Sequence, residues 1–121
     1  MIRATLLGGG DADAREHAIA AALEPHAQNA VILEGLPAQH NALAGHARLD
    51  VVRIAAGCPC CQGNTVLRVH LNRLLRQRPD RLFIGVMAAD HVPALRAFLS
   101  SPPYDGMLEL TQDLLPGSRS R

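Results

Sequence analysis

Short apolar runs alternate along this chain with stretches in which apolar residues recur at helical spacing. The apolar runs predict strands at residues 3–7, 30–34, 50–55, 81–87 and 106–110. Helical spacing is present in residues 14–23, 64–77 and 90–99, and a proline follows each of the first two stretches. Strands that alternate with helices predict an α/β fold, a three-layer sandwich with a mostly parallel sheet.

Capping residues predict where two of the helices begin. Asp13 and Glu16 have the spacing of a capping box at the start of the first helix, and Asp90 is placed to cap the last one. Residues 35–49 are ambiguous. Their glycines and proline favour a loop, whereas residues 41–44 could form one helical turn.

The bulk composition describes one globular domain. We expect it to cover residues 1–115 of the 121-residue chain, followed by a disordered tail at residues 116–121. Hydrophobic residues make up 48% and aromatic residues only 2%, so the core should be aliphatic. A net charge of +1 gives no basic surface of the kind that nucleic-acid-binding proteins carry. Without a membrane-length apolar run or a visible signal peptide, we expect a cytoplasmic protein with no membrane contact.

All three cysteines of the chain, Cys58, Cys60 and Cys61, fall within four positions. Disulfides between such close neighbours would be strained, and cytoplasmic thiols stay reduced. Bunched thiolates are ligands for soft cations, which predicts a site for zinc or a similar metal. Two other interpretations remain open: a redox-sensing thiol cluster, and small apolar side chains buried in the core.

Other residues could complete such a metal site. Glu34 ends the second apolar run, and the carboxyl ends of parallel strands share one edge of a sheet. Glu34 is therefore our first choice for the remaining ligand. His70 and His91 are reserves, with a water or a residue of a second chain as further options. No two histidines stand at i, i+4, so a helix face with paired histidine ligands is excluded.

The first predicted strand runs into three consecutive glycines, Gly8, Gly9 and Gly10. A phosphate-binding loop would lie there, with the pattern G-x-x-x-x-G-K-[ST]. In residues 8–15 only the first glycine of that pattern is present. Asp13 stands at its second glycine, Ala14 at its lysine, and Arg15 at the hydroxyl that binds Mg²⁺. We therefore expect a glycine turn before an acid-capped helix, with neither GTP nor Mg²⁺ bound.

The order of these segments resembles the CobW-like metallochaperone GTPases, P-loop proteins of the class that includes HypB and UreG. The specific part of the resemblance is the motif G-C-x-C-C, present as Gly57-Cys58-Pro59-Cys60-Cys61. Residues 31–34 are similar to the family strand that ends in an Asn-Glu pair, with Glu34 at the Glu and Leu33 at the Asn. Residues 3–23, 81–99 and 101–110 follow the family in order and spacing. The resemblance implies a P-loop NTPase-like fold, and a metal site that includes Glu34.

The sequence departs from this family at each nucleotide motif. The loop has no lysine or hydroxyl, and residues 85–90 replace the Glu-x-x-Gly switch without a carboxylate at its start. The 121 residues contain no lysine, so they hold no Asn-Lys-x-Asp segment, and they include no counterpart of the family's carboxy-terminal domain. The resemblance thus implies a pseudo-GTPase that binds zinc, with a complete CobW-like GTPase or a metal acceptor protein as partner. The alternatives are a divergent GTPase completed by a partner chain, and a structural or redox thiol protein.

Overall fold

The computed structural model describes residues 1–39, 42–46, 48–55 and 65–115. Within them lies a five-stranded sheet of order β3-β2-β4-β1-β5, in which every neighbouring pair is parallel. The strands are β1 (Ile2–Gly8), β2 (Asn29–Glu34), β3 (Leu49–Ile54), β4 (Arg81–Val86) and β5 (Leu108–Leu110). The helices are α1 (Ala12–Ala22), α2 (Thr65–Arg76) and α3 (Val92–Leu99), with 3₁₀ turns η2 (Ala89–His91) and η3 (Tyr104–Gly106).

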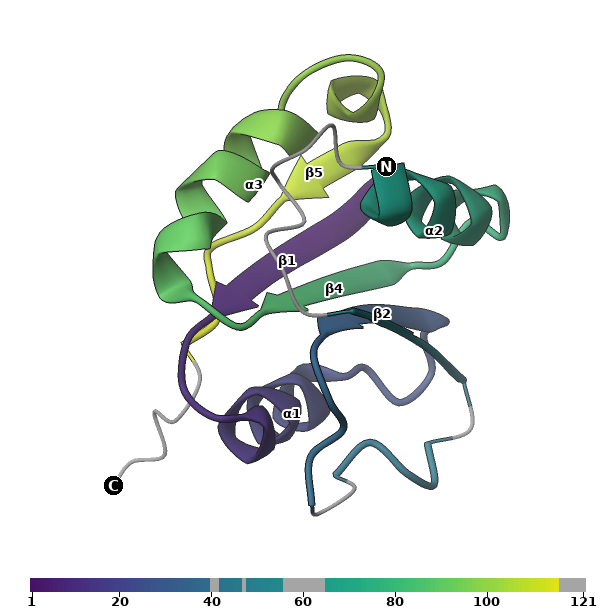
Figure 1. Ribbon diagram of the computed structural model, residues 1–121. Helices are drawn as coiled ribbons and strands as arrows, with labels where there is room; N and C mark the ends of the chain where they lie inside the picture. Colours follow the sequence, from purple (N-terminus) through teal and green to yellow (C-terminus); the bar gives the residue numbers. More distant parts are fainter. Residues whose placement is uncertain (40–41, 47, 56–64, 116–121) are drawn as a thin grey trace.

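Helices cover both faces of the sheet (Figure 1). α2 and α3 lie on one face and α1 lies on the other. The chain moves toward the β3 edge through α1 and returns toward β5 through α2 and α3, as right-handed crossovers require. This arrangement confirms the predicted α/β sandwich with a parallel sheet.

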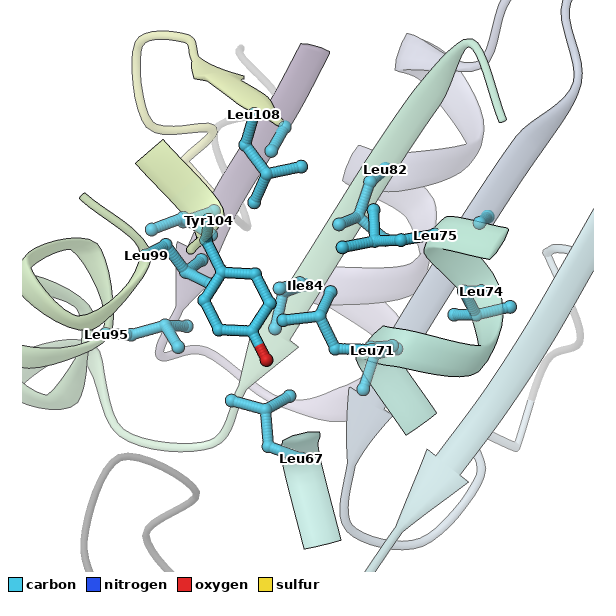
Figure 2. Close-up of a cluster of buried hydrophobic side chains, with 14 of the residues drawn as sticks. Leu67, Leu71, Leu74, Leu75, Leu82, Ile84, Leu95, Leu99, Tyr104 and Leu108 are labelled. Carbon is cyan, nitrogen blue, oxygen red and sulfur yellow. The ribbon is translucent and has the colours of Figure 1, made fainter. Parts of the chain in front are cut away.

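Alternating strand residues supply two apolar clusters, one on each face. The larger cluster packs α2, α3 and η3 on the sheet (Figure 2); it includes Leu67, Leu71, Leu74, Leu75, Leu82, Ile84, Leu95, Leu99, Tyr104 and Leu108. The smaller cluster packs α1 and part of the loop after β2 on the opposite face; its buried members are Leu7, Ile19, Val31, Leu33, Leu43 and Phe83. Because each buried leucine contributes about 2 kcal/mol, these aliphatic side chains are the main stabilising term of the fold.

The hydrophobic pattern predicted each of these strands and helices to within two residues at either end. β5 begins two residues later than predicted, because Gly106 belongs to η3 and Met107 caps that turn. Where the structure describes the stretch between β2 and β3, it contains neither helix nor strand, so the loop interpretation is correct there.

The predicted capping box of α1 is wrong. Asp11 caps the helix instead of Asp13, and its Oδ1 accepts a hydrogen bond from the backbone N of Ala14 at 2.8 Å. Glu16 does not reach back to the cap, because its carboxylate binds Arg53 of β3. The chain enters α1 two residues earlier than the pattern predicted.

The predicted cap of α3 is also wrong. Asp90 lies within η2, and no side chain of the described residues caps either η2 or α3. Pro93 lies in the first turn of α3, where its missing N–H costs nothing.

Several predictions concern residues that the structure does not describe. The three cysteines fall in residues 56–64 and the predicted tail is residues 116–121, so both lie outside the described residues. Among the helices that are described, none has the length and hydropathy needed to cross a bilayer.

Candidate functional site

The carboxyl ends of the parallel strands form one edge of the sheet, and β1 and β4 are neighbours there. β1 leads into α1 on one face, whereas β4 leads through η2 into α3 on the other (Figure 1). Open α/β sheets bind ligands at such a point, where adjacent strands send their connections to opposite faces. Both the glycine loop and Glu34 lie at this edge, which makes it the candidate site.

Glu34 is a buried carboxylate at the end of β2. Its side chain belongs to a residue that is only 4% exposed, and Oε1 accepts a hydrogen bond from the backbone N of Met87 at 2.8 Å. Gly35 follows with a φ of 98°, and a Cβ there would lie 2.9 Å from Sδ of Met87. The positive φ favours glycine in this turn, and the hydrogen bond from Met87 holds the Glu34 carboxylate beside the end of β4.

The register of the sheet places Glu34 beside the strand that precedes the cysteines. Glu34 pairs with Ile54, the last residue of β3, and the backbone N of Gly35 donates to the Ile54 carbonyl at 2.9 Å. The chain therefore leaves the sheet next to Glu34 before it reaches the cysteine motif. The predicted ligands Cys58, Cys60 and Cys61 themselves are not among the described residues.

The two reserve ligands come from different elements. His70 lies on α2 and His91 ends η2, and both are half-buried. In each, Nδ1 is buried and has no hydrogen-bond partner among the residues that the structure describes. No group of three or more metal-ligating side chains is close enough to hold an ion within the described ranges, so Glu34 and the two histidines do not form a site by themselves.

The glycine loop is closed by a side chain of its own helix. Arg15 is 5% exposed, and its Nη1 donates to the carbonyl oxygens of Gly9 at 3.0 Å and Gly10 at 2.5 Å. A phosphate-binding loop presents backbone N–H groups to the anion. Here the loop presents two backbone carbonyl oxygens to a buried guanidinium, so its polarity is opposite to that of a loop that binds phosphate.

The other side of the glycine loop is packed against the segment that follows β4. A Cβ at Gly8 would lie 2.7 Å from Cγ2 of Val92 and 2.9 Å from Cγ2 of Val86. A Cβ at Gly9 would lie 3.1 Å from the Cβ of Ala89. These glycines therefore serve close packing between the β1 loop and α3, and this accounts for their presence without a ligand.

A partly buried ion pair between Glu16 and Arg53 was missed by the sequence reasoning. Glu16 is 2% exposed, and its Oε2 accepts from Nη1 of Arg53 at 2.9 Å and from the backbone N of Ala38 at 3.2 Å. The pair joins α1, β3 and the loop after β2. The signal in the sequence was that Glu16 precedes Ile19 by three positions, which places both on one face of the helix.

Comparisons of the chain with family models, curated proteins and solved structures find no match. The resemblance to the CobW-like GTPases therefore stays a prediction, based on the cysteine motif and on the order of the segments.

Proposed function

We propose that this protein binds zinc, or a similar soft divalent cation, through Cys58, Cys60 and Cys61, and does not hydrolyse GTP. One observation carries the proposal: three thiols within four residues follow a strand whose last residue pairs with the buried Glu34. Thiolates together with a carboxylate are a donor set that Zn²⁺ accepts. The protein would handle or sense metal in the cytoplasm, where thiols stay reduced.

Chain length is consistent with a site that includes Glu34. Cys58 follows Ile54 by four residues, which span at most about 14 Å when fully extended. Adjacent strands are only about 4.8 Å apart, so Glu34 is within reach of the segment that carries the thiols. Zinc requires ligand atoms at about 2.3 Å for thiolate and about 2.0–2.2 Å for carboxylate. A fourth position open to solvent would suit a protein that passes metal on, and a closed site would suit a structural role.

The glycine loop supports the second half of the proposal. P-loop proteins hold the phosphates with backbone N–H groups and a lysine. This chain has no lysine, and Arg15 binds two carbonyls of the loop from within the protein. We propose that the partner is a complete CobW-like GTPase or a metal acceptor protein, which would supply any nucleotide-dependent step.

Metal analysis of the untagged protein tests this function. Wild-type protein washed with chelator should retain about one zinc per chain, measured by mass spectrometry of the metal, and Cys60→Ser should weaken zinc binding at least about a hundredfold. The matched variant is the triple replacement of Cys58, Cys60 and Cys61 by serine, which should retain no zinc. The proposal fails if the triple variant carries as much zinc as wild type.

A further inference from the structure

The outer face of α2 is unusual for a surface helix, because it combines apolar and basic residues. The helix buries Leu67, Leu71, Leu74 and Leu75 against the sheet. On the opposite side, the spacing i, i+3, i+7, i+10 places four exposed residues in one stripe: Val66, Val69, Arg73 and Arg76. Val66 is 56% exposed and Val69 is 60% exposed. We call this stripe the α2 face; Arg68 lies on the same helix beside it, and Arg78 follows the end of the helix.

Positive charge is concentrated on α2 and on the two residues that follow it. Residues 65–78 contain four exposed arginines and no acidic residue. None of the four forms an ion pair with any part of the chain that the structure describes. The other described residues hold six arginines against eleven acidic residues, a formal charge of −5. The small net charge of the protein therefore conceals a separation of charge, with positive residues on and near α2 and an excess of acidic residues in the rest of the described chain.

We propose that the α2 face is a docking surface for an acidic, partly apolar segment of a partner protein. A guanidinium group binds a carboxylate through two parallel hydrogen bonds, and every basic residue here is an arginine. Exposed ion pairs alone contribute little affinity, but Val66 and Val69 add apolar surface that a partner can bury. A helix that presents leucine and glutamate on one face fits both requirements.

The composition of the face favours protein over nucleic acid. Single-stranded nucleic acid is bound by basic grooves with aromatic platforms on which bases stack. The chain offers no such platform: Phe83 and Tyr104 are buried, and Phe98 is half-buried with the Arg68 guanidinium 5.4 Å from its ring centroid. Two exposed valines in the stripe would add nothing to phosphate binding. The inference does not depend on the proposed metal site.

Fluorescence anisotropy with a labelled peptide tests the proposal on the full chain. The probe is a peptide of about 20 residues with leucine and glutamate at helical spacing, which is long enough to fold as a helix on binding. We expect micromolar binding that weakens as salt rises from about 50 mM to about 300 mM. The double variant Arg73→Gln/Arg76→Gln should lose about tenfold in affinity. Val69→Ser should lose severalfold, because it removes apolar surface without a change of charge.

Ala21→Glu is the matched control. Ala21 is exposed on α1, on the opposite face of the sheet, and the replacement lowers the net charge by one unit, as each Arg→Gln change does. It should leave peptide affinity unchanged, and circular dichroism should show that all variants fold as wild type.

Four results would overturn the proposal. The first is no peptide binding up to about 100 μM, an affinity too weak for a specific interface. The second is an equal loss for Ala21→Glu and Arg73→Gln, which would indicate attraction by net charge alone. The third is tighter binding of a poly(U) RNA of equal length than of the peptide. The fourth is self-association in sedimentation that Arg73→Gln/Arg76→Gln abolishes, which would assign the face to a second copy of the chain.

Discussion

Arg15 donates from Nη1 to the carbonyl oxygen of Gly9 at 3.0 Å, so a buried guanidinium fills the loop in which a P-loop protein would hold a phosphate. The same nitrogen also reaches the carbonyl of Gly10. Asp11, the next residue, uses its carboxylate to cap α1. The loop therefore has an internal cation for its carbonyls and an internal anion for the first turn of its helix.

This arrangement predicts that the protein does not bind GTP. Asp11 and Asp13 fall within the residues that align with the P-loop pattern, so their carboxylates should repel bound phosphates. Two unit charges about 4 Å apart interact by roughly 4 kcal/mol at an effective dielectric constant near 20. Calorimetry with micromolar GTP and Mg²⁺ should give no isotherm. Ala14→Lys combined with Arg15→Thr should not restore binding, because Asp13 still stands at the glycine position. A clear 1:1 isotherm with the wild-type protein would contradict this prediction.

The packing of the same loop predicts that Gly8 cannot be replaced without cost. A Cβ at Gly8 would lie 2.7 Å from Cγ2 of Val92 and 3.0 Å from the backbone oxygen of Ala88, which cannot rotate away. Gly8→Ala should lower the free energy of unfolding by about 1–3 kcal/mol, as overpacked cores do. Gly106→Ala is the control, since a Cβ there meets nothing within 4 Å, and it should change stability by less than about 0.5 kcal/mol. Urea unfolding of both variants measures the difference, and equal effects would contradict the close packing.

The apolar pattern was sufficient to predict the architecture, because it depends on burial alone. β4 is buried at all six positions, as its continuous apolar run predicted. α2 was equally clear, since its four buried leucines recur at helical spacing. The carboxyl-edge position of Glu34 followed from the parallel order of the strands and the end of an apolar run.

Charged residues account for what the pattern could not predict. The residues that α1 buries are Arg15, Glu16 and Ile19, and two of these would normally be assigned to the surface. The partner of Glu16 is remote in the sequence, since Arg53 is 37 positions away. The partners of Arg15 are backbone carbonyls of Gly9 and Gly10, two glycines that adopt positive φ, so the interaction depends on the loop conformation. The residue that caps α1 depends on the same glycine turn. Local spacing therefore favoured Asp13, whereas Asp11 caps the helix in the structure.

The ion pair of Glu16 and Arg53 predicts unequal effects when either partner is removed. Glu16 is almost completely buried, whereas the Arg53 side chain is 29% exposed. Arg53→Ala leaves a buried carboxylate without its cation and should cost about 2–3 kcal/mol. Glu16→Gln leaves an arginine that water can reach and should cost only about 1 kcal/mol. Urea unfolding measures both, and the double variant should lose less than the sum of the two. The reverse order would mean that Glu16 is not desolvated.

A second carboxylate predicts how stability depends on pH. At the amino edge of the sheet, Glu24 accepts from Nη1 of Arg81 at 2.9 Å and from Nη2 of Arg3 at 2.8 Å. The hydrogen bond from Arg81 is the main cause that holds the pKa of Glu24 below its ordinary value of 4.5. Because the folded pKa is the lower one, the interaction stabilises the fold above the ordinary value and is lost as pH falls through the folded pKa.

The difference in unfolding free energy between wild type and Glu24→Gln should therefore be largest near neutral pH and should shrink in acid. Urea unfolding of both proteins across that range checks it. A difference that stays constant down to the acid limit would show that the two arginines do not act on the Glu24 charge.

Glu34 provides the sharpest test of the proposed zinc site, because its two possible roles respond differently to one substitution. Glu34→Gln keeps an oxygen that can accept the hydrogen bond from the backbone N of Met87 but removes the carboxylate charge. If Glu34 binds zinc, this variant should bind zinc about tenfold more weakly than wild type, which is a smaller loss than for Cys60→Ser. Competition with a chromophoric zinc chelator measures the affinities.

Glu24→Gln is the control for Glu34→Gln. It makes the same chemical change to a carboxylate that binds arginines at the amino edge of the sheet, opposite to the edge at which Glu34 lies, so zinc affinity should be unchanged. Suppose instead that Glu34→Gln binds zinc as wild type does while Cys60→Ser loses about a hundredfold. Glu34 would then have only a structural role, in which its hydrogen bond with Met87 connects β2 to the segment after β4. His91 and His70, whose Nδ1 atoms have no hydrogen-bond partner within the described part of the chain, would become the first candidates for the remaining ligand.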